Sequence, residues 1–156
     1  MSGFIDHLGA KSGMIGRTGT DYEEGDWTPT LVGATPASSG SVTYDGITNG
    51  RYTKIGRWVF VRAYIQTSAD DSNASGNVHI NGLPFTSDNF SGNVGGGSVT
   101  QQHGWASTNP NFIQIQSGGT HCRVDTGSAK TQASEISDGG ETAIAFTASY
   151  MTAITS

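Results

Sequence analysis

Glycine is the feature of this sequence that most limits the folds open to it. Glycine occupies 23 of 156 positions, about twice its usual frequency. A glycine inside a helix costs about 1 kcal/mol relative to alanine, whereas the turns between β-strands use glycine readily. Charged residues make up only 13% of the chain. The two facts together exclude a coiled coil and favour a β protein with glycine-rich turns.

Residues that build a hydrophobic core are scarce. Leu, Ile, Val and Phe fill 28 of the 156 positions, just under the level of about 20% at which a highly charged chain becomes disordered. The net charge is only −5, so we expect a folded chain with a thin core. This length corresponds to one domain. A thin core also predicts partner subunits that bury additional surface.

Composition excludes several classes of function. The chain is acidic rather than basic, so we expect no general affinity for nucleic acid. No apolar run approaches the length of about 18 residues that a membrane span needs, and residues 1–4 lack the basic start of a signal peptide. The single cysteine, Cys122, cannot form a disulfide framework. We expect it to be a small buried residue.

The clearest predicted strand covers residues 58–66, in which side chains alternate between two faces. One face carries Val59, Val61, Ala63 and Ile65. The other face carries Trp58, Phe60, Arg62 and Tyr64. Because both faces contain large apolar groups, we expect a central strand that is covered on both sides near its start.

Further alternating segments complete an all-β prediction. In the last strand, residues 142–152, the apolar face carries Ile144, Phe146, Ala148 and Tyr150. Its other face is small, and either packs closely against another sheet or subunit or faces solvent. Residues 86–98 contain four glycines and are expected to form a loop. Short strands separated by turn signals predict an antiparallel β-sandwich or jelly-roll domain over residues 21–156.

Four short segments stand out in the predicted β domain. They are Tyr22–Leu31 (YEEGDWTPTL), Gly50–Arg57 (GRYTKIGR), Asn81–Phe85 (NGLPF) and Ala148–Thr152 (ASYMT). In this order they resemble a module of tailed-bacteriophage virion proteins, especially tail-fibre and other surface proteins of aquatic phages. Asp26 stands where the commonest form of the first segment has threonine. The resemblance covers about residues 21–156 and implies a β-sandwich, a homotrimer and a non-enzymatic virion role.

We expect the residues of these segments to be structural rather than to bind a ligand, because a chain with few core formers must bury its large side chains. Trp27 and Tyr52 are suited to anchoring the core. Gly56 is expected in a tight turn that aims the central strand. The complete structural set is Trp27, Pro29, Tyr52, Lys54, Gly56, Leu83, Pro84 and Phe85.

Residues 1–20 differ from the rest and predict an extended N-terminal arm. A few apolar residues are followed by four glycines that interrupt a helix. The arm is expected to attach the domain to the virion; the alternative is a flexible terminus. The expected anchoring residues are Phe4, Ile5, Leu8, Met14 and Ile15.

No pattern in the sequence indicates catalysis, a metal or a cofactor. His121 and Cys122 are adjacent on a predicted strand and would point to opposite faces, so they cannot share a metal. Residues 70–73 are acidic but lack the ligand spacing of an EF-hand. Residues 127–131 resemble a phosphate loop, but Ala129 stands where glycine is required. We therefore expect no enzyme.

The segment 101–111 is the candidate ligand or receptor loop. The Trp105 ring could stack on a sugar, and the neighbouring amides and the His103 imidazole could form hydrogen bonds with the sugar hydroxyl groups. Loops on a rigid scaffold are the usual place for binding. The alternative is that Trp105 is a buried anchor of the loop. The candidate residues are Gln101, Gln102, His103, Trp105, Asn109 and Asn111.

Two positions on the particle remain open. One is a tail-fibre-like module that contacts glycans of the host surface. This position is favoured because the resembling module occurs especially in tail-fibre proteins. The other is a head-decoration or cement protein, which a short chain without a long shaft favours. A lectin-like binding module is a third alternative. For a virion protein we expect synthesis in the host bacterial cytoplasm and partners among the tail or capsid proteins.

Overall fold

The computed structural model of the chain describes residues 22–33, 43–69, 76–107, 109–127, 129–136 and 141–153. Within these ranges the chain is all-β, as predicted, with strands in one antiparallel sheet and a short 3-10 turn, η1 (Ala133–Glu135). The described strands are β1 (Tyr22–Trp27), β2 (Thr30–Gly33), β3 (Thr43–Ile55), β4 (Trp58–Ala69), β5 (Val78–Asn81), β6 (Asn93–His103), β7 (Phe112–Gln116), β8 (His121–Asp125) and β9 (Thr142–Met151).

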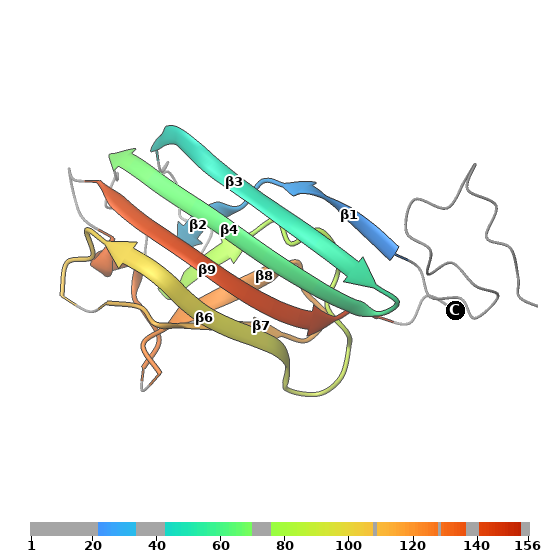
Figure 1. The fold of residues 1–156 in the computed structure, drawn as a ribbon. Coiled ribbons are helices and arrows are strands. Elements are labelled where there is room, and N and C mark those ends of the chain that lie inside the picture. Colours follow the sequence, from blue (N-terminus) through green and yellow to red (C-terminus); the bar gives the residue numbers. More distant parts are fainter. Residues whose placement is uncertain are drawn as a thin grey trace, which may run out of the picture.

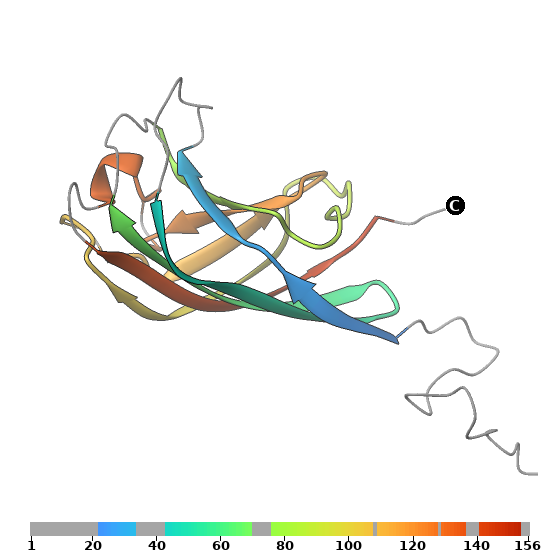
Figure 2. The same ribbon diagram turned by 90° about the horizontal axis from the view of Figure 1, so that it is seen from above.

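The sheet curls into two facing layers. The strand order is β1-β3-β4-β9-β6-β7-β8-β5-β2. Figures 1 and 2 show β1, β3, β4, β9 and β6 in one layer, here called the first layer, and β7, β8, β5 and β2 behind it in the second layer. This arrangement is the antiparallel β-sandwich that the alternating segments predicted.

The two edge strands of the sheet follow one another in the chain. β1 pairs with β3 in the first layer and β2 pairs with β5 in the second layer, although only Thr28 and Pro29 separate them. Figure 2 shows this segment crossing from one layer to the other. Pro29 has no N–H group, so it gives up no strand hydrogen bond of its own where the pairing is interrupted. The crossing joins the layers covalently at the edges.

The core lies between the layers. The predicted inward faces of β4 and β9 are both buried, and the second layer meets them mainly with isoleucine and valine. Cys122 is completely buried, and burial raises the pKa of its thiol to about 12. The largest fully buried side chains are Tyr150, Phe146, Leu31, Ile65, Ile80, Ile113, Ile115, Ile136, Ile144, Val59, Val78 and Val124.

The outward face of β4 differs from its prediction. Trp58 is 46% exposed and Phe60 is 49% exposed, so the expectation that both faces are covered near the start of the strand is wrong for a single chain. The reason is the topology, because the second layer packs on one side of the first layer. The opposite side of β4 is an outer surface.

The glycine-rich segment also differs from its prediction. Residues 93–98 belong to β6, which lies between β9 and β7, rather than to a loop. A Cβ atom at Gly97 would lie 1.9 Å from the Thr147 carbonyl oxygen, and one at Gly95 would lie 2.3 Å from the Ser149 oxygen. These glycines allow the close approach of β6 to β9. They are required by packing within the sheet, not by a turn.

Candidate functional site

The outer face of the first layer carries a row of polar residues that crosses all five strands. Strand register places Asp26, Arg51, Arg62, Thr147 and Ser98 next to one another on β1, β3, β4, β9 and β6. Directly opposed residues of antiparallel strands share one face. The row therefore places two arginines side by side on the open surface.

The next row toward the β3–β4 turn contains Glu24, Thr53, Phe60, Ser149 and Gly96. Long side chains on β3 and β4 thus lie beside glycine and hydroxyl side chains on β6 and β9. The difference in side-chain length hollows the surface. The result is a shallow groove of about 490 Å³, which we call the arginine groove.

Two further hollows adjoin the arginine groove and also include both arginines. One, of about 390 Å³, extends toward Tyr64 and Thr100. The other, of about 500 Å³, extends toward Glu24 on β1. Arg51 and Arg62 are thus shared by all three hollows and lie at their junction.

The two arginines differ in their charge partners. The Arg51 Nε atom lies 3.4 Å from Asp26 Oδ1, with the side chains 68% and 83% exposed, so the ion pair is weak and screened by solvent. Arg62 forms no hydrogen bond or ion pair with another residue that the structure describes. A guanidinium group presents a planar fork of donors that suits a carboxylate or phosphate. The arginine groove can therefore accept an anion.

An aromatic pair extends the same face toward the β3–β4 turn. The rings of Trp58 and Phe60 stack with centroids 6.5 Å apart and an interplanar angle of 25°. Both rings are about half exposed. They provide a flat apolar surface beside the polar groove.

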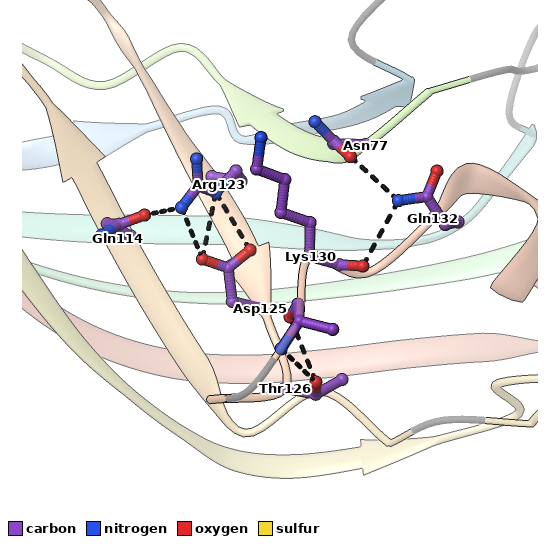
Figure 3. Close-up of polar contacts among 8 residues, drawn as sticks. Asn77, Gln114, Arg123, Asp125, Thr126, Lys130 and Gln132 are labelled. Carbon is purple, nitrogen blue, oxygen red and sulfur yellow. Dashed lines mark hydrogen bonds and ion pairs between the residues drawn. The ribbon is translucent and has the colours of Figure 1, made fainter.

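The outer face of the second layer is also polar, but its groups bind one another (Figure 3). Arg123 donates to both carboxylate oxygens of Asp125, from Nε at 3.0 Å and from Nη2 at 2.9 Å, and also donates to Gln114 Oε1. The side chains of Arg123 and Asp125 are only 14% and 12% exposed. Nearby, Gln132 donates to Asn77 Oδ1 at 2.9 Å. The first group of bonds holds β7 and β8 together, and the second joins the segment after β8 to Asn77, just before β5.

Two histidines lie on this second-layer face. The rings of His79 and His121 stack with centroids 4.9 Å apart and an interplanar angle of 15°. Burial lowers the pKa of His79, and the charges of His121 and Arg123 lower it further. No group of three or more His, Cys, Asp or Glu side chains is placed to hold a metal in the described ranges. Cys122 is buried while His121 is partly exposed, in keeping with their predicted opposite directions.

The candidate loop 101–111 does not form one site. Trp105 is buried, and its indole N–H donates to the Ala143 carbonyl oxygen at 3.2 Å. The alternative of a buried anchor therefore describes Trp105, and stacking of this ring on a sugar is wrong for the structure. Residues 101–103 belong to the end of β6, where His103 Nε2 lies 2.6 Å from Glu141 Oε1.

The two asparagines of the candidate loop are exposed and lie beyond Trp105. The backbone N–H of Asn111 donates to the Asp125 carbonyl oxygen at 3.1 Å, which places Asn111 beside the end of β8. None of the six candidate residues lines the arginine groove. Their exposed members are Gln101, His103, Asn109 and Asn111, with Gln102 partly buried.

The structure brings the four sequence segments together, three of them through the side-chain contacts that follow. A Cβ atom at Gly50 would lie 2.4 Å from the buried Trp27 indole nitrogen. The Tyr52 ring meets the Phe85 ring edge to face, with centroids 5.3 Å apart and an angle of 85°. Lys54 Nζ lies 5.4 Å from the centroid of the Phe85 ring. Segments far apart in the sequence thus form one packed corner.

The remaining members of the structural set surround this corner. Pro29 and Leu83 are buried, and Pro84 is partly buried beside them. Gly56 has a φ of +59° in the β3–β4 turn, a conformation that favours glycine. The fourth segment also reaches the corner, since the Tyr150 hydroxyl donates to the Phe85 carbonyl oxygen at 3.0 Å. The expected arm residues, Phe4, Ile5, Leu8, Met14 and Ile15, lie outside the described residues.

Sequence reasoning did not find the arginine groove. The alternation of residues 58–66 places Arg62 and Phe60 on one face, and the small face of residues 142–152 fits either close packing or contact with solvent. The missing information was strand register, which joins Arg51, Arg62 and Thr147 into one row. Register depends on pairings between distant strands.

Comparisons with known proteins give one structural likeness. Neither a scan of protein-family models nor a search of curated proteins finds a match. Among solved structures, the chain is similar to the Dettilon tailspike protein, with a TM-score of 0.62 and 18% sequence identity. The match covers 83% of this chain and 24% of that chain. At this identity the likeness shows a shared fold. In the described ranges no helix has the length and apolar character of a membrane span.

Proposed function

We propose that this chain is a non-enzymatic structural module of a bacteriophage virion, associated with the tail. The observation that carries the proposal is the fold, which is shared over 83% of the chain with part of a phage tailspike. The resemblance of the sequence segments to tailed-phage surface proteins is independent support. The packed corner gives each of those segments a structural role, because Trp27 lies against Gly50, the Tyr52 ring packs on Phe85, and Tyr150 donates to the Phe85 carbonyl oxygen.

The finer proposal is a surface-displayed, tail-fibre-like homotrimer that is attached through residues 1–20 and contacts glycans of the host surface. The exposed Phe90 and Phe112, which lie outside the arginine groove, support assembly, because a second chain would bury them. Light scattering of the purified chain should give the mass of three chains. A stable monomer at micromolar concentration would refute the trimer.

The location is tested by counting copies of this chain in purified virions, with quantitative mass spectrometry against the major capsid protein. A small multiple of the symmetry of the tail is the expected result. A count that scales with the icosahedral lattice would instead identify a head-decoration protein. Absence from the particle would refute the virion role.

Attachment is tested by deleting residues 1–20 from the chain. We expect the β domain to keep its thermal transition but to be lost from assembled particles. The matched control is the substitution Thr147→Ala on the outer face of β9, which should leave incorporation unchanged. Normal incorporation of the deletion variant would show that attachment uses another surface.

A further inference from the structure

We propose that the arginine groove binds a saccharide that carries a carboxylate, with the carboxylate held between Arg51 and Arg62. The proposal names the chemical class of the glycan and moves its contact from the loop 101–111 to the outer face of the first layer. Its biological setting rests on the proposed function, whereas the binding itself rests on the groove.

The charges of the groove point to an anion. Like charges on directly opposed residues destabilise a sheet, yet Arg51 and Arg62 are direct partners on β3 and β4. They are two of only eight Lys and Arg residues in a chain whose net charge is −5. Asp26 neutralises Arg51 in part, and no described residue pairs with Arg62. A ligand carboxylate between the guanidinium groups removes their repulsion.

The neutral groups of the groove point to a sugar. Hydroxyl side chains of Thr53, Ser98, Thr147 and Ser149 line it, and none of them is engaged by another described residue. Phe60 adds an aromatic ring that is half exposed at the edge of the same groove. Hydroxyl groups can bond to sugar hydroxyls while a ring packs on the apolar face of a pyranose. The volume of about 490 Å³ lies within the range of small-ligand sites.

The short side chains on the floor of the groove allow the sugar ring of a ligand to lie close to the sheet. Gly96, Gly97 and Ser98 on β6 lie beside Thr147, Ala148 and Ser149 on β9, so short side chains cover two adjacent strands. Larger side chains at these positions would fill the hollow. Gly96, on the outward side of β6, thus leaves room for a ligand, while its neighbour Gly97 allows β6 to approach β9.

The second-layer cluster is a poorer candidate for the same ligand. Arg123 already donates to Asp125 and to Gln114, and its side chain is only 14% exposed. An incoming carboxylate would compete with Asp125 for the guanidinium. The molecule thus allows a direct comparison of two arginines, because Arg123 is already paired with Asp125 and Arg62 is not paired with a described residue.

The test is isothermal titration calorimetry of the full-length chain at low salt. The probes are tri-galacturonate, the neutral galactose trisaccharide, inorganic phosphate and poly-glutamate. We expect tri-galacturonate to bind at least tenfold more tightly than each of the others. Arg62→Gln should weaken that binding at least tenfold. Lys130→Gln is the matched control, because it removes one positive charge from an exposed residue outside the groove and should leave binding unchanged.

Each opposite result overturns part or all of the proposal. Equal binding of the neutral trisaccharide would remove the role of the carboxylate, and tighter binding of phosphate or poly-glutamate would remove the saccharide. Equal losses in Arg62→Gln and Lys130→Gln would indicate a general charge effect, and no binding of tri-galacturonate would refute the site. Thermal transitions of both variants check that they are folded. A chain counted on the tail that binds no uronate refutes this inference but not the virion role.

Discussion

The two outer faces of the sandwich use the same pair of residue types in different ways. On the second layer, Arg123 and Asp125 are nearly buried and form several hydrogen bonds. On the first layer, Arg51 and Asp26 are mostly exposed and 3.4 Å apart. The difference teaches that exposure and the neighbouring side chains, rather than residue type, decide whether an arginine holds the fold or remains open to a partner.

The neighbours of each arginine explain the difference. Long side chains surround Arg123, including Gln114, His79 and His121, and they shield its ion pair from water. Short side chains on β6 and β9 lie next to Arg62 and leave it open. Burial strengthens a well-bonded pair because it reduces solvent screening. The arginines of the first-layer face are thus accessible to a ligand but contribute less to local stability.

The largest expected loss of stability comes from truncating a side chain in the core that both layers share. Trp105→Ala removes a buried ring and the hydrogen bond to the Ala143 carbonyl oxygen. We expect the free energy of unfolding to fall by about 4 kcal/mol, because large aromatic truncations leave a cavity. Chemical denaturation measures the change. The exposed neighbour Ala106 provides the control Ala106→Ser, and a stable Trp105→Ala variant would show that the ring is not an anchor.

The next effect tests the close packing of β6 on β9 behind the arginine groove. Gly97→Val introduces a Cβ atom that would lie 1.9 Å from the Thr147 oxygen and 2.5 Å from the Ala148 Cα atom. Because both are backbone atoms, the strands must separate, and we expect a loss of about 3 kcal/mol in unfolding free energy. Ser98→Ala, one residue along the same strand, should have little effect. Equal stability of Gly97→Val and Ser98→Ala would contradict the close packing of β6 on β9.

A smaller effect compares the two ion pairs directly. Asp125→Asn leaves the nearly buried Arg123 without its carboxylate, and we expect a loss of about 2 kcal/mol in unfolding free energy. Asp26→Asn on the exposed first-layer pair should produce no measurable change. Urea denaturation of both variants at one ionic strength gives the comparison. If the two substitutions cost the same, burial is not what separates the faces.

The smallest effect is a pH dependence that belongs to the second-layer face. Burial lowers the pKa of His79 below its usual value of 6.5. As the pH falls, the unfolded chain therefore binds this proton before the folded chain does. Stability from this group is complete above about pH 6.5 and declines as the pH falls from there toward the folded-state pKa. Thermal denaturation between pH 7.5 and 5.5 should show a smaller decline in His79→Gln, whereas Thr147→Ala should keep the decline of the original chain.

Local sequence patterns predicted which strand faces point inward, whereas the place of residues 93–98 and the arginine groove depend on pairings between distant strands. The alternation in residues 58–66 and 142–152 correctly identified buried residues such as Val61 and Phe146, because side-chain direction in a strand has a period of two. Glycine was misleading at residues 93–98, since its local preference for turns is overruled by the close contact of Gly97 with β9. The groove required the register of five strands, which no local pattern contains.

The chain ends of the first layer also determine how the domain would respond to mechanical force. Tyr22, Ile55, Trp58 and Met151 are successive partners in one row, so the chain enters β1 and leaves β9 at the same end of the layer. A pull on the chain before Tyr22, directed along β1, loads all six pairs between β1 and β3 in shear. Strands sheared together resist more force than strands unzipped one pair at a time. The continuation of β1 through Pro29 into β2 then transmits the load to the second layer, so that both layers share the tension.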